Sequence, residues 1–291
     1  MNRCGQMLVI VLWLLGLLSL AVGGVSVRAV HELRLGGIPL NTVRHQALAQ
    51  GAVQQAAALL QRDEPHVDHL DELWATGLDP DTKQQLLVEA PLGDGRFSIG
   101  VERDGAFVPG LMDEERKLNL NTVAQDVLAR LIAAVGPAGV DAQAVATTIV
   151  RWRTTCQDIP VPCHGAVFDT IDELRLVPGL SPDLFAALVP NVTVYGSGLV
   201  NVNTASADVL SALGCDGTAL VQQRSKTGPF QTPPPGCPGV GVTSTFFTVP
   251  VEVWIPGRAN RARLQAVIDR RGCQAPAPQG QRCLVSWSAH P

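Results

Sequence analysis

The chain has 291 residues, of which 46 % are hydrophobic and 16 % are charged, and its formal net charge is −4. This is enough chain for one large or two ordinary domains with an apolar core. The mild acidity excludes a general electrostatic attraction to nucleic acid or to anionic lipid.

A long apolar segment begins after a leader of only five residues. The uncharged stretch Met7–Val27 is close to the roughly 20 residues that cross a bilayer as a helix. We therefore expect one membrane-spanning helix near the N-terminus. The alternative is an ordinary signal peptide cleaved after Gly23, which would remove the whole segment.

After Val27 the helical pattern continues but becomes amphipathic. One face of this helix is predicted to be buried, and it carries Leu48, Ala52, Ala56, Leu59 and Leu60. Gly36, Gly37 and Pro39 are expected to break or kink the helix. Further on, apolar and polar residues alternate around Asp104-Gly105, and this pattern predicts a β-hairpin.

A short acidic and histidine-rich stretch lies between the helix and the hairpin. Within seven positions it contains His66, Asp68, His69, Asp71 and Glu72. Two histidines three positions apart, with no third ligand placed elsewhere, are a weak zinc signal. We interpret the stretch as a solvated turn and predict no metal site there.

Residues 113–213 have the pattern of several short helices. Thr122 with Gln125 and Thr170 with Glu173 have the spacing of capping boxes, and Ser181-Pro182 places proline at a first helical position. Asp141 is expected to begin a further helix.

This block contains an internal repeat. "LNLNTVAQDVL" (118–128) matches "VNVNTASADVL" (200–210) at an offset of 82 residues. The polar residues that coincide are Asn119, Asn121 and Thr122 with Asn201, Asn203 and Thr204. We predict that these residues cap helix starts, and we favour duplicated packing geometry over a ligand site.

Strand patterns return after about Thr243. "STFFTVPVEVWI", "ARLQAVIDRR" and "CLVSW" predict three strands, with a turn at Pro256-Gly257 between the first two. The sequence thus predicts an α+β fold in which a helical block is inserted between strands.

Six cysteines follow the apolar segment in three close pairs. Their spacing favours the disulfides Cys156–Cys163, Cys215–Cys237 and Cys273–Cys283 in an oxidising compartment, with Cys4 left in the leader. A zinc site of Cys156, Cys163 and His164 is the alternative, but it lacks a CxxC spacing.

The chain carries none of the sequence motifs GxSxG, HExxH, GxGxxG or the phosphate-binding loop. Neither Tyr195 nor the scattered histidines offer a nucleophile–base pair, so we predict that the protein is not an enzyme.

"LVPGLSPDLFAAL" followed by "VNVNTASADVL" resembles the helix-hairpin-helix modules of ComEA-like DNA receptors. The hairpin at Gly179-Leu180-Ser181 lacks a second glycine, and residues 113–213 carry eleven acidic and six basic side chains. We therefore expect no nucleic-acid binding.

Taken in order, the motifs of the chain resemble the GspK family, the large minor pseudopilins of the bacterial type II secretion system. They are "GQMLVIVLWLLGLLSLA", "DELW", "DEERKLNLNT", "TIVRWR", "IDELRLVPGLSPDLF", "TVYGSGLVNVNTASADVL" and "STFF". The resemblance implies a pilin-like α+β fold with a long N-terminal transmembrane helix, an antiparallel sheet and an inserted all-α domain of helix-hairpin-helix or SAM-like type. The implied divisions are a prepilin leader at 1–5, the helix at 6–62, the α+β body at 63–112 and 214–291, and the insert at 113–213.

The resemblance also implies a function and partners. The protein would cap the tip of the pseudopilus that exports folded proteins across the outer membrane, in a tip complex with other minor pseudopilins and in contact with the inner-membrane secretion machinery. A type IV pilus tip or DNA-uptake protein is the alternative function. The body would be periplasmic and held by a single inner-membrane pass before assembly. No cofactor is expected, although the resemblance leaves calcium in the α+β body open.

A prepilin peptidase would cut between Gly5 and Gln6 and methylate Gln6. Most pilins carry glutamate at the fifth mature position, where this chain has Ile10. An unpaired carboxylate in hydrocarbon costs about 2.5 kcal/mol or more. The absence of glutamate therefore suits a subunit that has no neighbour above it.

Overall fold

The computed structural model describes residues 42–63, 66–154, 165–258, 260–273 and 283–290. The leader, Gly5, Gln6, Ile10, the predicted membrane helix, its break at Gly36, Gly37 and Pro39, and the Cys156–Cys163 pair with its zinc alternative lie outside the described residues. Among the residues that are described, no helix is both long and apolar enough to span a bilayer.

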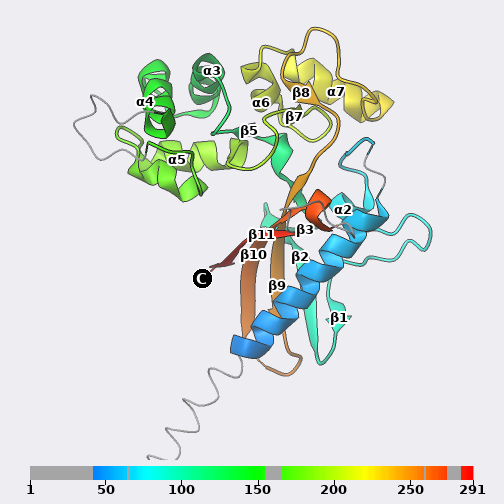
Figure 1. Ribbon diagram of the computed structural model, residues 1–291. Coiled ribbons are helices and arrows are strands. Elements are labelled where there is room, and N and C mark those ends of the chain that lie inside the picture. The colour runs from blue at the N-terminus through cyan, green and yellow to red at the C-terminus, as the bar shows by residue number, and fades with distance from the viewer. Residues whose placement is uncertain (1–41, 64–65, 155–164, 259, 274–282, 291) are drawn as a thin grey trace, which may run out of the picture.

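The chain forms a sheet-and-helix body with a helical block at one end of it (Figure 1). The body contains the N-terminal helix (42–62), α2 (Leu73–Thr76), β1 (Ala90–Leu92), β2 (Gly95–Arg103), β3 (Ala106–Pro109), β4 (Met112–Asp113), β9 (Phe246–Trp254), β10 (Arg261–Asp269), α8 (Arg270–Cys273) and β11 (Leu284–His290). The block contains η1 (Glu114–Arg116), β5 (Leu118–Asn119), α3 (Gln125–Val135), α4 (Ala142–Thr154), η2 (Ile171–Leu176), α5 (Pro182–Leu188), η3 (Val189–Asn191), β6 (Val192–Thr193), β7 (Val200–Asn201), α6 (Ala207–Ala212), α7 (Gly217–Thr227) and β8 (Val240–Gly241).

The body is built on an antiparallel sheet. Its strand order is β1-β2-β9-β10-β11, while β3 pairs with β2 and β4 pairs with β9. The hairpin predicted around Asp104-Gly105 is confirmed as β2–β3, with positive φ angles of 53° and 78° at these two residues. The three predicted C-terminal strands are confirmed as β9, β10 and β11.

The N-terminal helix lies across one face of this sheet (Figure 1). The predicted apolar face is confirmed, since Leu48, Ala52, Ala56, Leu59 and Leu60 are all buried in the core of the body. Burying such a stripe against a sheet gives the helix most of its stability, because short helices are marginal in water.

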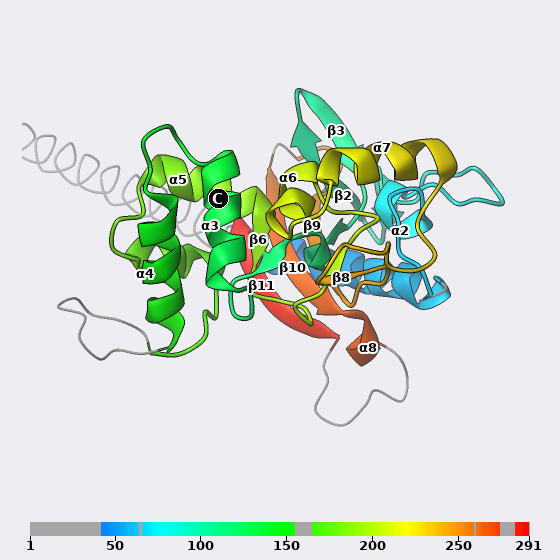
Figure 2. The same cartoon turned by 90° about the horizontal axis from the view of Figure 1, so that it is seen from above.

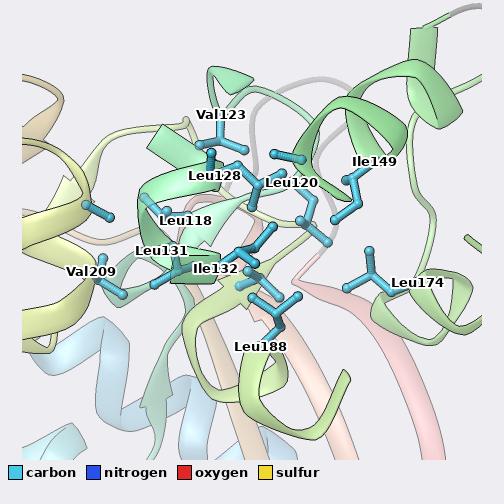
Figure 3. Packing of buried hydrophobic residues seen from close by; sticks show 14 of the residues in the cluster. Leu118, Leu120, Val123, Leu128, Leu131, Ile132, Ile149, Leu174, Leu188 and Val209 are labelled. Carbon is cyan, nitrogen blue, oxygen red and sulfur yellow. The ribbon is translucent and has the colours of Figure 1, made fainter. Parts of the chain in front are cut away.

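The helical block has a separate apolar core. Leucine and isoleucine side chains from α3, α4, η2 and α5 meet there, as the labelled residues Leu128, Ile132, Ile149, Leu174 and Leu188 show (Figure 3). Seen from above, the block extends across the end of the sheet, with α4 at one side and α7 at the other (Figure 2).

The block continues beyond Leu213, where the sequence predicted its end. Helix α7 follows, and Val240 of β8 is buried in the same core. The block also contains two short parallel strand pairs, β5–β6 and β7–β8, which the prediction of an all-α insert did not include.

Two of the three predicted disulfides are confirmed. Cys215–Cys237 closes the segment that contains α7, and Cys273–Cys283 joins α8 to the start of β11. Cross-links of this kind stabilise proline- and glycine-rich segments by restricting the unfolded chain.

Candidate functional site

In each copy of the internal repeat, the side chain of the second asparagine hydrogen-bonds the backbone N–H and C=O of a phenylalanine. Asn121 Oδ1 accepts from Phe168 N at 2.7 Å, and Asn121 Nδ2 donates to Phe168 O at 3.0 Å. Asn203 makes the same pair of bonds with Phe230, at 2.8 Å and 3.0 Å. The repeat is therefore a duplicated structural unit in which one amide side chain fixes a distant loop.

An arginine from a following helix completes each unit. Arg153 of α4 donates to the carbonyl oxygens of Leu120 and Val123, and Arg224 of α7 donates to that of Val202. Leu120 and Val202 occupy equivalent positions of the repeat. These arginines and the two phenylalanines were not among the residues predicted from the sequence, although "FDT" at 168–170 and "FQT" at 230–232 occupy matching places in the two copies.

The prediction that the repeat residues cap helix starts is wrong. Helix α3 begins at Gln125 with Ala124 as its N-cap, and Ser206 caps α6 by accepting from Val209 N at 3.3 Å. Thr122 and Thr204 instead end short turns, because their N–H groups donate to Asn119 O and Asn201 O.

Two other predicted helix starts are confirmed. Thr170 and Glu173 form a capping box at η2, and Ser181-Pro182 starts α5.

The first asparagine of the repeat bonds different parts of the protein in the two copies. Asn119 Nδ2 donates to the carbonyl oxygens of Tyr195 and Gly196, inside the helical block. Asn201 Nδ2 donates to Asp68 O at 3.1 Å, and therefore reaches into the body. The second copy of the repeat thus ties the block to the sheet.

Asp113 is the centre of this junction, at the end of β4. Its Oδ2 accepts from Thr204 Oγ1 at 2.5 Å, from Ser244 Oγ at 2.6 Å and from Asn201 Nδ2 at 3.3 Å. Its Oδ1 accepts from Glu115 N at 2.8 Å. One buried carboxyl group therefore joins residues from both parts of the chain.

The next two acidic residues extend the junction. Glu114 accepts from Thr193 of the block at 2.5 Å, from Thr248 of β9 at 2.7 Å and from Lys117 at 2.8 Å. Glu115 accepts from Ser197 N at 3.3 Å and from the N–H groups of Thr245 and Phe246. Buried carboxylates with this many donors are stabilising only while every partner stays in place.

The predicted solvated turn is wrong at Asp68, which is 0 % exposed. Its Oδ2 accepts from Ser244 N at 2.6 Å, and its Oδ1 accepts from Arg270 Nη2 at 2.6 Å. Arg270 also bonds Asp63 at 2.9 Å. His66 and Asp71 of the same stretch are exposed, as predicted for a turn.

The acidic cluster does not fit the calcium ion that the family resemblance left open. Asp63, Asp68 and Glu72 bring ligand oxygens within 4.8 Å of one another. However, the guanidinium of Arg270 bonds Asp63 and Asp68 directly and supplies the positive charge between them. A divalent cation would have to displace a buried side chain.

Burial controls the ionisation of the carboxyl groups in and beside the junction. It raises the pKa of Asp113 to about 7, against the opposing hydrogen bonds from Ser244 and Thr204. It also raises the pKa of Asp63, to about 6, with the charge of Glu72 adding to the effect. Glu114 differs: burial opposes its ionisation, yet Lys117 and the two threonines lower its pKa.

We expect the protein to be more stable at pH 5 than at pH 8. A carboxyl group whose pKa is raised in the folded state binds its proton more tightly there than in the unfolded chain. The resulting stabilisation is fully present below the unfolded pKa of about 3.8 and is lost as pH rises through about 7 for Asp113. Urea unfolding at the two pH values measures this difference.

The variant Asp113→Asn is the control for this prediction. Because asparagine does not titrate, the difference in unfolding free energy between pH 5 and pH 8 is expected to shrink. An unchanged difference in Asp113→Asn would show that Asp113 does not titrate in this window.

Comparisons with known proteins agree with this architecture. Residues 111–197 match the family model described as type II secretion system (T2SS), protein K. A chain of the solved GspK-GspI-GspJ complex from the type 2 secretion system of enterotoxigenic Escherichia coli has the same fold, with a TM-score of 0.64 at 18 % identity. The match covers 89 % of this chain and 99 % of that one. Among curated proteins there is no significant match.

Proposed function

We propose that this chain belongs to the type II secretion system protein K family and is a minor pseudopilin that caps the tip of the pseudopilus and supports export of folded proteins. The position of the helical block carries the proposal. The N-terminal helix begins at one end of the sheet, and the block sits at the opposite end (Figure 1). A block in that place occupies the end on which a further subunit would otherwise stack.

The buried junction gives the block a fixed orientation on the body. Asp113, Asn201 and Ser244 form a closed hydrogen-bonded set in which each member comes from a different segment. We infer that the protein works as a rigid structural cap and not as an enzyme, since the carboxyl groups of Asp113, Glu114 and Glu115 are used to hold the two parts together.

Other minor pseudopilins are the proposed partners. The solved complex that shares this fold contains GspK together with GspI and GspJ. We propose that this chain joins its own counterparts of those proteins in a tip complex, with its body in the periplasm and its N-terminal segment anchored in the inner membrane before assembly.

Two measurements test the cap function together. Deletion of the gene is expected to stop secretion of the exported proteins, and the tagged full-length chain is expected to co-purify with the other minor pseudopilins. Normal secretion in the deletion strain would contradict the proposal. Binding of duplex DNA that weakens steeply with salt would instead favour the DNA-uptake alternative.

A bulky residue at position 5 is expected to block maturation. We propose that a prepilin peptidase cuts between Gly5 and Gln6 and methylates Gln6, and that Ile10 takes the place of the pilin glutamate. Gly5→Leu should then leave the full-length precursor, which mass spectrometry of the membrane fraction detects.

Gly23→Leu is the matched control for this prediction. It should be processed normally, because cleavage between Gly5 and Gln6 would leave Gly23 within the mature chain. An N-terminus at Gly24 in the wild-type protein would show that an ordinary signal peptidase acts instead.

A further inference from the structure

The Cys273–Cys283 disulfide fixes a one-turn helix at the end of the body that faces the block. Cys273 is the last residue of α8, the short orange-red helix at that end of the sheet (Figure 1), and Cys283 directly precedes β11. A helix of four residues is not stable through its own backbone bonds. Asp269 N donates to Cys283 O at 2.9 Å, and Gln61 Nε2 donates to Cys273 O. The position of α8 therefore depends on its attachment to β11 and to the N-terminal helix.

Arg270, the first residue of α8, holds the linker that joins the block to the sheet. This linker comprises residues 242–245, between the end of β8 and the start of β9. The backbone N–H of Arg270 donates to Thr245 O at 2.8 Å, and Arg270 Nη2 bonds Asp68 Oδ1 at 2.6 Å. Asp68 Oδ2 in turn accepts from Ser244 N at 2.6 Å. Arg270 therefore acts on the linker both directly and through Asp68.

Asp68 extends the contact to the block itself. Its backbone N–H donates to Val242 O at 2.8 Å, at the end of the linker nearest β8. Its backbone oxygen accepts from Asn201 Nδ2 at 3.1 Å, and the same amide group donates to Ser244 Oγ at 2.8 Å. A continuous path of covalent and hydrogen bonds thus runs from the disulfide through α8, Arg270 and Asp68 to β7 of the block.

The contact between Arg270 and Asp68 requires a restraint on the backbone. The two side chains are 5 % and 0 % exposed, so both charged groups have lost their hydration. Within the described residues, Nε and Nη1 of Arg270 have no hydrogen-bond partner, although a guanidinium offers five donors. Such a group regains hydration by turning into water, unless the backbone that carries it is held in place. The disulfide supplies this restraint, because it closes a sequence separation of only 10 residues.

We propose that the Cys273–Cys283 disulfide is a redox-sensitive clip that fixes the helical block on the body through Arg270. When a dithiol reduces the clip, two electrons and two protons convert the S–S bond into two thiols, and the dithiol becomes a disulfide. Helix α8 is then released from β11, Arg270 leaves Asp68, and the linker loosens. The inference goes beyond the proposed cap function and does not depend on it.

Hydrogen exchange of the full-length chain in detergent tests the clip. In Cys273→Ala combined with Cys283→Ala, the amides of the linker 242–245 are expected to exchange at least about tenfold faster, because opening of the junction exposes them. Cys215→Ala combined with Cys237→Ala is the matched control, since that disulfide packs against the block's own core. The control should speed exchange in α7 and leave the linker unchanged. Dithiothreitol added to the control protein should reproduce the effect of the clip variant without any substitution in the clip.

Arg270→Met shows whether the clip acts through Arg270. This variant should speed exchange in the linker by itself, and the two clip substitutions should then add little, because non-additivity is the mark of a shared path. Three results would overturn the proposal: unchanged linker exchange in the clip variant, equal acceleration in the control, and full additivity with Arg270→Met. None of them bears on secretion or on co-purification with pseudopilins, so the failure of the clip and the failure of the cap function are distinguishable.

Discussion

Arg270→Met is expected to lower the free energy of unfolding by about 3–5 kcal/mol at neutral pH. Arg270 and Asp68 have side chains that are 5 % and 0 % exposed, and their Nη2 and Oδ1 atoms are 2.6 Å apart. Methionine fills a similar volume but leaves Asp68 charged, buried and without its cation. The loss of this partner, and not the loss of packing, dominates the effect. Urea unfolding monitored by tryptophan fluorescence measures it.

Two variants control for other causes. Arg270→Met combined with Asp68→Asn should recover much of the loss, because the buried charge is then removed as well. Arg175→Met should change stability by less than about 1 kcal/mol, since Arg175 and Asp172 form a solvent-exposed pair. A loss in Arg270→Met no larger than that in Arg175→Met would mean that Asp68 does not need the ion pair.

Trp74→Ala is expected to destabilise the body by about 3–5 kcal/mol, as truncations of buried aromatic residues do. Trp74 is 1 % exposed and packs edge-to-face on Phe247, with ring centroids 4.9 Å apart. Its Nε1 also donates to Glu72 at 2.6 Å. Alanine leaves a cavity between α2 and β9 and removes that donor.

Trp74→Phe separates the two contributions. Phenylalanine keeps most of the packing and loses only the N–H donor, so a loss of about 1 kcal/mol is expected. Thermal or urea unfolding of both variants gives the comparison. If Trp74→Ala is no less stable than Trp74→Phe, the ring does not fill a rigid core position.

The sequence could predict the elements that depend on neighbouring residues. The buried face of the N-terminal helix follows from helical spacing of residues such as Leu48, Ala52 and Leu59. The β2–β3 hairpin follows from Asp104-Gly105, which adopts the positive φ angles that its turn requires. The Cys215–Cys237 and Cys273–Cys283 bridges follow from close spacing. In each case the physical cause lies within a short stretch of chain.

Tertiary structure alone decided the roles of the polar residues. Asn201 bonds the backbone of Asp68 across 133 residues of sequence, and Asp68 bonds Ser244 across 176. An asparagine before a helix has the same local pattern whether it caps that helix or fixes a remote loop. Its role depends on which unpaired backbone groups the fold brings near, as Phe168 and Phe230 show for Asn121 and Asn203. The burial of Asp68 could not be predicted from the sequence for the same reason. Its partner Arg270 lies 202 residues further along the chain, and the two meet only when the sheet has formed.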